Sequence, residues 1–251
     1  MKKYLHDTYT HNFESPFEIV SILNKALHPK TVVDIGCGTG TFLNQFKKMG
    51  VQKVLGIDGP WAKNDLLYQN LEEHEFIEMN LEGPIKLGTR FDLALCLEVA
   101  EHLHEQYADN LITALIQLSD IIIFSAAIPF QGGQNHINEQ WPDYWKKKFE
   151  SNNYKIFDVL RPILWENRNV QWWYKQNIFI ASNKTALFDE HIFERYYNQK
   201  VLDNYVHPDL YIEKCKQLEN TLSGRESFIF YLKLIIKKML GIRSTHQKVL
   251  T

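Results

Sequence analysis

The stretch VVDIGCGTGTFL, which runs from Val32 to Leu43, decides most of what this sequence predicts. It begins as a short apolar strand ending at Asp34, continues as a loop with glycine at every second position, and ends with Phe42 and Leu43 on an apolar helical face. A strand that passes through a glycine-rich turn into a helix places backbone N–H groups and a helix N-terminus around a ligand.

The glycine spacing separates the candidate ligands. A dinucleotide-binding loop would read G-x-G-x-x-G, with a glycine where this chain has Thr41. The pattern here is an acid followed by G-x-G-x-G, formed by Asp34, Gly36, Gly38 and Gly40. In this motif the chain resembles the class I S-adenosylmethionine-dependent methyltransferases, whose acid and loop hold the methionine part of the cofactor. The alternative interpretation is a tight strand–helix turn without a ligand.

Three later segments match the same family in the expected order. KVLGID ends at Asp58, at a distance from the loop that suits an acid bound to ribose hydroxyls. FIEMNL has Asn80 where the family often has an aspartate that receives the adenine amino group, and FDLALCLE resembles the family's fourth strand. The resemblance therefore implies S-adenosylmethionine as cofactor, S-adenosylhomocysteine as product, and contacts from Asp34, Gly36, Cys37, Gly38, Gly40, Asp58, Gly59, Asn80, Leu81, Leu97 and Glu98.

The order of apolar runs predicts the fold class. Strand-like runs alternate with helical stretches over residues 31–128, which predicts an α/β, doubly wound, Rossmann-like sheet. Late strands are expected at 154–160 and 176–181. The resemblance implies that these complete a seven-stranded methyltransferase sheet whose last strand is antiparallel. We assign residues 1–185 to this domain.

Composition excludes several classes of protein. The chain has 251 residues, of which 45% are hydrophobic and 23% charged, as in soluble globular proteins. A net charge of −2 gives no general attraction to nucleic acid. Three scattered cysteines indicate a reducing compartment, and the sequence shows neither a signal peptide nor a membrane-spanning apolar run. We expect a cytoplasmic protein that binds no nucleic acid.

Residues 186–251 are predicted to be a mostly helical C-terminal extension. Six of the 28 Lys and Arg residues, but one of the 30 acidic residues, lie in 224–251. Over residues 227–243 apolar side chains recur at helical spacing, with Lys233 and Lys237 on the opposite side. Such a helix can bind the inner membrane face peripherally, or dock on its own domain or on a second subunit of a homodimer.

The loop after the fifth strand, IPFQGGQNHINEQW, carries the candidate acceptor chemistry. Ligands of doubly wound sheets lie beyond the carboxyl ends of the strands, where this loop begins. We assign His136 as general base, because the pKa of histidine lies near neutrality, and Gln134, Asn138 and Gln140 to the acceptor. The alternative is a surface loop whose polar groups satisfy its own backbone.

A second group of residues, Glu98, Glu101 and His102, follows the pattern E-x-x-E-H at the expected start of a helix. With His136 they could bind a divalent metal, as in small-RNA 3′-end 2′-O-methyltransferases and some ubiquinone-pathway O-methyltransferases, which this pattern resembles. We expect Glu101 and His102 to support catalysis or to bind the metal. The alternative is structural: Glu101 caps the helix and His102 packs beneath the acceptor.

The acceptor is predicted from resemblance and from aromatic residues. The loop after strand five, with the later QWWYKQN and VHPDLY, resembles methyltransferases of bacterial capsule and lipopolysaccharide gene clusters. Trp172 and Tyr174 could stack on sugar rings or belong to the core. These features predict methyl transfer to a hydroxyl on a cell-surface glycan or a nucleotide-sugar-type precursor. The alternatives are O- or N-methylation of another small metabolite, and a non-catalytic cofactor-binding scaffold in a glycan-assembly complex.

Overall fold

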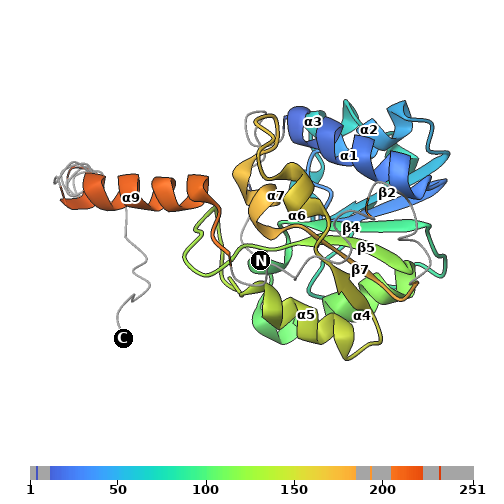
Figure 1. Cartoon of the computed structure of the whole chain (residues 1–251). Helices are drawn as coiled ribbons and strands as arrows, with labels where there is room; N and C mark the ends of the chain where they lie inside the picture. Colours follow the sequence, from blue (N-terminus) through green and yellow to red (C-terminus); the bar gives the residue numbers. More distant parts are fainter. Residues whose placement is uncertain (1–3, 5–11, 185–192, 194–204, 223–231, 233–251) are drawn as a thin grey trace. The chain divides into compact units, whose positions relative to one another are not determined.

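The computed structural model describes residues 4, 12–184, 193, 205–222 and 232 of the chain (Figure 1). The chain forms two compact units, Met1–His207 and Pro208–Thr251. The first unit continues beyond residue 185, where we placed the end of the domain, because Phe193 is fully buried in its hydrophobic core.

Within the described residues, seven strands form one sheet in the order β3-β2-β1-β4-β5-β7-β6 (Figure 1). The strands are β1 (Thr31–Ile35), β2 (Lys53–Asp58), β3 (Phe76–Glu78), β4 (Leu93–Leu97), β5 (Ile121–Ser125), β6 (Lys155–Phe157) and β7 (Phe179–Ser182). The first five are parallel, whereas β7 is antiparallel to both β5 and β6. The predicted seven-stranded methyltransferase sheet is confirmed.

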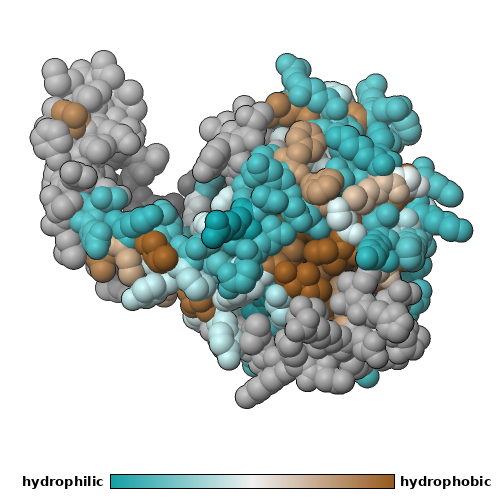
Figure 2. All heavy atoms as spheres, turned by 45° about the horizontal axis from the view of Figure 1, so that its top comes forward, coloured by the Kyte–Doolittle hydropathy of each residue, from teal (hydrophilic) through white to brown (hydrophobic). Residues whose placement is uncertain are grey.

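Helices cover both faces of the sheet. They are α1 (Glu14–Leu27), α2 (Thr41–Lys48), α3 (Asp65–Tyr68), α4 (Ala108–Leu118), α5 (Pro142–Glu150), α6 (Leu160–Leu164) and α7 (Trp172–Asn177). Successive side chains of a strand point to opposite faces. Val32 of β1 accordingly packs in a core with residues of α1 and α2, and Val33 in a second core with residues of α4 and α5. On the face shown in Figure 2, the described side chains are mostly hydrophilic, with hydrophobic ones gathered near the middle.

The segment after β4 differs from the prediction. Instead of starting a helix, Ala100–His102 forms a single 3-10 turn, and α4 begins at Ala108. Glu98 has a φ of 54°, outside the helical range, and its N–H donates to Ser125 on β5. The carbonyl of Glu101 accepts hydrogen bonds from the backbone of the later loop, at Ile137 and Asn138. These tertiary bonds replace helical ones, so Glu98, Glu101 and His102 do not share a helix face.

The second unit contains α9 (Pro208–Leu222). Several of its large apolar side chains are exposed, including Tyr211 and Leu218. The predicted basic amphipathic segment 227–243 lies outside the described residues, apart from Leu232. In the part of the chain that the structure describes, no helix has both the length and the apolar character needed to cross a membrane.

Candidate active site

The glycine loop between β1 and α2 is shaped by close contacts. Gly36 has a φ of 79°, and its N–H donates to the carbonyl of Ile57 at 2.7 Å. A Cβ at Gly36 would lie 2.3 Å from Cγ2 of Val99, so a larger residue would displace the turn after β4. The loop ends at Gly40, which caps the N-terminus of α2. Helix N–H groups at this point are suited to binding the negative groups of a ligand.

Asp58, at the end of β2, fixes the same loop. Its carboxylate accepts the N–H groups of Gly38 at 2.8 Å and of Gly59 at 2.6 Å. Burial raises the pKa of Asp58 to about 6, although these hydrogen bonds and one from Trp61 favour the charged form. If Asp58 binds ribose hydroxyls, as predicted, those hydroxyls must share the carboxylate with these donors.

Asp34 lies on β1 directly opposite Gly56 of β2 and is 3% exposed. Burial raises its pKa to about 7, and the charge of Asp58 adds to the effect. A cationic ligand bound here would favour the ionised form of both groups. Cys37 packs against β2, because a Cβ at Gly56 would lie 2.6 Å from its Sγ. Burial raises the pKa of the Cys37 thiol well above its ordinary value, which suits a packing residue rather than a nucleophile.

The remaining predicted cofactor residues lie at or just after the carboxyl ends of β2, β3 and β4. Asn80 is exposed, and its Oδ1 already accepts the N–H of Glu82 at 3.1 Å, within its own turn. Leu81 and Leu97 are buried, at 2% and 8% exposure. A Cβ at Gly59 would lie 2.3 Å from the ring of Trp61. If the adenine amino group donates to Asn80, as predicted, it must therefore share the Oδ1 atom with the N–H of Glu82.

Glu98 is held by two amide side chains that the sequence did not single out. Asn177 of α7 donates to both carboxylate oxygens, at 3.0 and 3.2 Å, and Gln131 donates to one at 3.0 Å. Asn177 also donates to the Oε1 of Gln131 at 2.9 Å. Burial raises the pKa of Glu98, while these hydrogen bonds lower it. The network connects the end of β4, the loop after β5, and α7.

Glu101 and His102 lie on the 3-10 turn, and His136 approaches them from the loop after β5. One ligand atom from each of the three lies within 4.8 Å of the others. Both carboxylate oxygens of Glu101 and the Nδ1 of His102 are buried without a hydrogen-bond partner among the described residues. The structure thus brings together three of the four predicted metal ligands, while Glu98 points into its amide network.

The titration of this group is set mainly by burial. Burial, and then the charge of Glu98, raises the pKa of Glu101 well above its ordinary value. Burial, and then the charge of His136, lowers the pKa of His102 to about 4. His102 is therefore neutral near pH 7 and can accept a hydrogen bond or bind a metal ion.

His136 is held in place by its own loop. Its Nδ1 lies 2.9 Å from Oε1 of Glu139. The Glu139 carboxylate also accepts the N–H groups of Phe130 at 2.8 Å and of Gly132 at 2.6 Å. A Cβ at Gly133 would lie 2.2 Å from Nε2 of His136, so the glycine makes room for the ring. The histidine, its carboxylate partner and the two glycines form one preorganised unit.

The three residues predicted to bind acceptor have different surroundings. Asn138 is buried at 4% exposure; its N–H donates to the Glu101 carbonyl, which anchors the loop to the 3-10 turn. Gln140 is half-buried and donates to Oδ1 of Asn138 at 3.0 Å. Gln134 is exposed. The geometry gives Asn138 a structural position and leaves Gln134 and Gln140 accessible.

Aromatic residues surround the same edge of the sheet. Tyr174 packs edge-on against Phe42 of α2, with 5.5 Å between ring centroids. Burial raises the pKa of Tyr174, and the charge of Glu98 adds to it. Trp172 is half-buried, and Tyr4 lies edge-on to His102 with 5.1 Å between centroids. Tyr174 thus lies beside α2, the helix that follows the predicted cofactor loop.

Comparison with known proteins shows the family and the fold of the chain. A family model described as "Methyltransferase domain" matches residues 9–143, just over half of the chain. The chain belongs to the class I S-adenosylmethionine-dependent methyltransferase family. It is 27% identical over 177 residues to "Ubiquinone biosynthesis O-methyltransferase, mitochondrial" of Dictyostelium discoideum, with 56% of this chain and 54% of that protein aligned. The chain thus spans about half the length of the curated relative that it matches.

Solved structures share the fold of this methyltransferase. Magnesium protoporphyrin IX methyltransferase of Synechocystis PCC 6803 with bound SAH gives a TM-score of 0.53 at 18% identity, over 73% of this chain and 90% of its own. A sugar N-methyltransferase of Streptoalloteichus gives 0.55 at 11% identity, over 73% and 96%. An amino pentose methyltransferase of Micromonospora echinaspora, with bound SAM, gives 0.52 at 12% identity, over 73% and 100%.

Proposed function

We propose that this methyltransferase transfers the methyl group of S-adenosylmethionine to a hydroxyl of a sugar, or of a sugar substituent, in a cell-surface glycan or its precursor. The observation that carries the proposal is the His136–Glu139 pair, because a hydroxyl acceptor must lose its proton and a histidine oriented by a carboxylate is suited to take it. This pair lies beside Glu101 and His102, beyond the carboxyl ends of β4 and β5.

The cofactor would be held at the edge formed by the ends of β1 and β2. When bound, it supplies a methyl group already activated by a sulfonium. Asp34 and Asp58 are buried carboxyl groups that a cationic ligand would help to ionise, and the N–H groups at the start of α2 suit a carboxylate. Val99 beneath Gly36 fixes the distance between this loop and the turn that carries Glu101. The chain's main task is alignment of the acceptor with the methyl group.

Proton removal is assigned to His136. With Nδ1 engaged by Glu139, Nε2 is the nitrogen that can accept the acceptor's proton. The carboxylate then stabilises the charged ring that results. His102, which burial keeps neutral, packs against the His136 ring, and Tyr4 packs against His102.

The glycan acceptor is supported by several features of lesser weight. The chain resembles methyltransferases of capsule and lipopolysaccharide clusters, and two of its structural neighbours are named for sugars. Other relatives are named for ubiquinone biosynthesis and for a porphyrin, which makes a different small metabolite the competing acceptor.

Methyl-labelled S-adenosylmethionine tests the proposal directly. The purified protein is incubated with an extract of the source organism, separated into glycan, nucleotide-sugar and small-metabolite fractions. Label in a glycan or nucleotide-sugar fraction is expected, and label among other metabolites alone would contradict the acceptor class. His136→Ala should lose turnover and keep cofactor binding, which also separates an enzyme from a non-catalytic scaffold.

A second arrangement of the same site is favoured by the orphaned polar atoms of Glu101 and His102. Buried polar groups without partners are costly unless a ligand satisfies them. Glu101, His102 and His136 offer one carboxylate and two imidazoles, a donor set that would suit a divalent transition-metal ion such as Mn²⁺ better than Mg²⁺. A cation held there would lower the pKa of an acceptor hydroxyl.

A further inference from the structure

We propose that a surface cavity along α5 is a second acceptor subsite, which binds an uncharged sugar residue neighbouring the one that is methylated. This inference rests on the proposed function, because it requires the acceptor to be a glycan. Apart from Gln140, which the sequence already assigned to the acceptor, the lining residues take no part in the chemistry described above.

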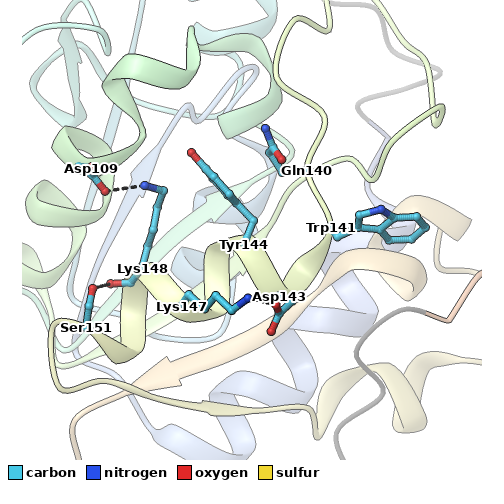
Figure 3. A pocket seen from close by; sticks show the side chains of 8 residues that line it. All are labelled: Asp109, Gln140, Trp141, Asp143, Tyr144, Lys147, Lys148 and Ser151. Carbon is cyan, nitrogen blue, oxygen red and sulfur yellow. Dashed lines mark hydrogen bonds and ion pairs between the residues drawn. The ribbon is translucent and has the colours of Figure 1, made fainter.

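The cavity has a volume of about 520 Å³. Its walls come from the first turn of α4, the end of the loop after β5, and α5 (Figure 3). The lining residues are Asp109, Gln140, Trp141, Asp143, Tyr144, Lys147, Lys148 and Ser151. In Figure 3 the Trp141 indole stands at one end of the group and the Asp109–Lys148 pair at the other.

The cavity begins close to the proposed base. Gln140 lines it and lies four residues after His136, and four residues of chain span at most about 14 Å. The connecting loop is fixed, since the N–H of Gln140 donates to the carbonyl of Ala127 at 3.1 Å. A chain of sugars that presents one residue to His136 can therefore place another against Gln140.

Aromatic side chains provide the stacking surface. Trp141 is 40% exposed, so part of its indole is open to a ligand. Tyr144 is held edge-on against Trp145, with 4.9 Å between centroids, and beneath the ammonium of Lys148, 4.7 Å from its ring. Aromatic rings with an apolar face and polar neighbours suit the C–H faces of a sugar ring, whose hydroxyls bond to the surrounding groups.

The charges of the cavity select an uncharged ligand. Lys148 pairs with Asp109 at 2.7 Å, and Lys147 pairs with Asp143 at 2.6 Å. The two acids and two amines cancel, so an anion such as a phosphate finds no excess positive charge. The same carboxylate and ammonium groups, with the amide of Gln140, can accept from and donate to hydroxyls.

Binding here would act on catalysis from a distance. Contacts to a non-reacting part of the substrate can be used to align the reacting part, so short acceptors should be poorer substrates than long ones. The geometry therefore predicts that kcat/KM rises with acceptor length, and that Trp141 is responsible for the rise.

The experiment uses the full chain, methyl-labelled S-adenosylmethionine, and single-sugar and oligosaccharide fractions from mild hydrolysis of the source organism's surface polysaccharide. Trp141→Ala should lower kcat/KM for oligosaccharides by about 10-fold and change that for single sugars little, each tenfold step corresponding to about 1.4 kcal/mol. Trp141→Phe should recover much of the loss. Tyr68→Ala, at a similarly exposed aromatic residue on α3, is the matched control.

The outcomes separate this inference from the proposed function. Methylation of oligosaccharides with equal kinetics in Trp141→Ala and Tyr68→Ala would overturn the subsite and leave the function standing. Methylation of single sugars or nucleotide sugars, without methylation of oligosaccharides, would also overturn the subsite and leave the function standing. No methylation of any sugar fraction would overturn both.

Discussion

Glu139 lies three residues after His136 and accepts a hydrogen bond from its Nδ1 at 2.9 Å. The same carboxylate binds the backbone N–H groups of Phe130 and Gly132, on the other side of the loop. One side chain therefore closes the loop and orients the ring within it. Glu139 acts as a positioning residue for the proposed base, since it reaches the reacting atoms only through His136.

Replacing Glu139 by glutamine keeps its size and removes its charge. We expect kcat to fall about 10- to 100-fold, because the charged imidazole formed during proton transfer loses its stabilising carboxylate. The acid limb of the pH–rate profile should move to lower pH, since the same change lowers the proton affinity of His136. The matched control is Glu73→Gln, at an exposed acid in a 3-10 turn. A lower rate with an unshifted pH profile would indicate a structural role alone.

Gly133→Ala tests whether the room beside His136 matters. The added Cβ would lie 2.2 Å from Nε2 of the ring, so the ring must leave its position beside Glu139 or the loop must shift. A displacement of this kind should lower kcat about 100-fold. The melting temperature and the affinity for S-adenosylmethionine should change little, because the clash is local to the loop. Unchanged kcat would show that the loop adapts and that the glycine is not required.

Cofactor affinity should depend on pH. Burial raises the pKa of Asp34 to about 7 and of Asp58 to about 6, from 3.8. Carboxyl groups with raised pKa values stabilise the folded protein most below pH 3.8, and this contribution is lost as the pH rises through 6 to 7. A cationic ligand needs the ionised form, so affinity for S-adenosylmethionine should increase between about pH 5.5 and 8, with release of protons.

Calorimetry in buffers of different ionisation enthalpy measures those protons directly. Asp34→Asn should bind more weakly at pH 8 and lose most of the pH dependence. Affinity that is constant across this range in the unaltered protein would contradict the role assigned to the two carboxyl groups.

Chelation tests the metal-assisted arrangement. If Glu101, His102 and His136 hold a divalent cation, excess EDTA should abolish activity and Mg²⁺ or Mn²⁺ should restore it. Mn²⁺ binding, followed by electron paramagnetic resonance, should weaken in His102→Asn and persist in His74→Asn, at an exposed histidine. Full activity in excess chelator would leave proton removal by His136 as the mechanism.

The sheet was predictable because its central strands are buried on both faces. Residues 32–35 and 93–97 are buried without a break, and such strands appear in sequence as continuous apolar runs. The antiparallel last strand came from the family resemblance, not from the apolar pattern. The helix start expected at Glu98, Glu101 and His102 was wrong, because the carbonyl of Glu101 accepts hydrogen bonds from a loop more than 30 residues later.

The candidate site was predictable where local sequence sets its geometry. The glycine loop and His136 belong to short segments whose residue types indicate their chemistry. Gln131 and Asn177 do not, since their amides meet at Glu98 only after the strands are assembled. Nothing in the local pattern distinguishes these amides from surface ones, whose side chains hydrogen-bond to water.

The buried ion pair between Asp158 and Arg161 leads to a prediction about stability. Two hydrogen bonds, at 2.7 and 2.6 Å, join the carboxylate to the guanidinium, and both residues are buried. Arg161→Met should lower the free energy of unfolding by about 3–5 kcal/mol, because the Asp158 charge stays buried without its guanidinium. Adding Asp158→Leu should recover most of that loss, since it removes the buried charge.

Urea denaturation measures both variants, and Arg90→Met is the control. Arg90 pairs with Asp120 at the surface, so its replacement should lower the free energy of unfolding by less than about 1 kcal/mol. Equal losses in Arg161→Met and Arg90→Met would show that burial adds nothing to the importance of the first pair.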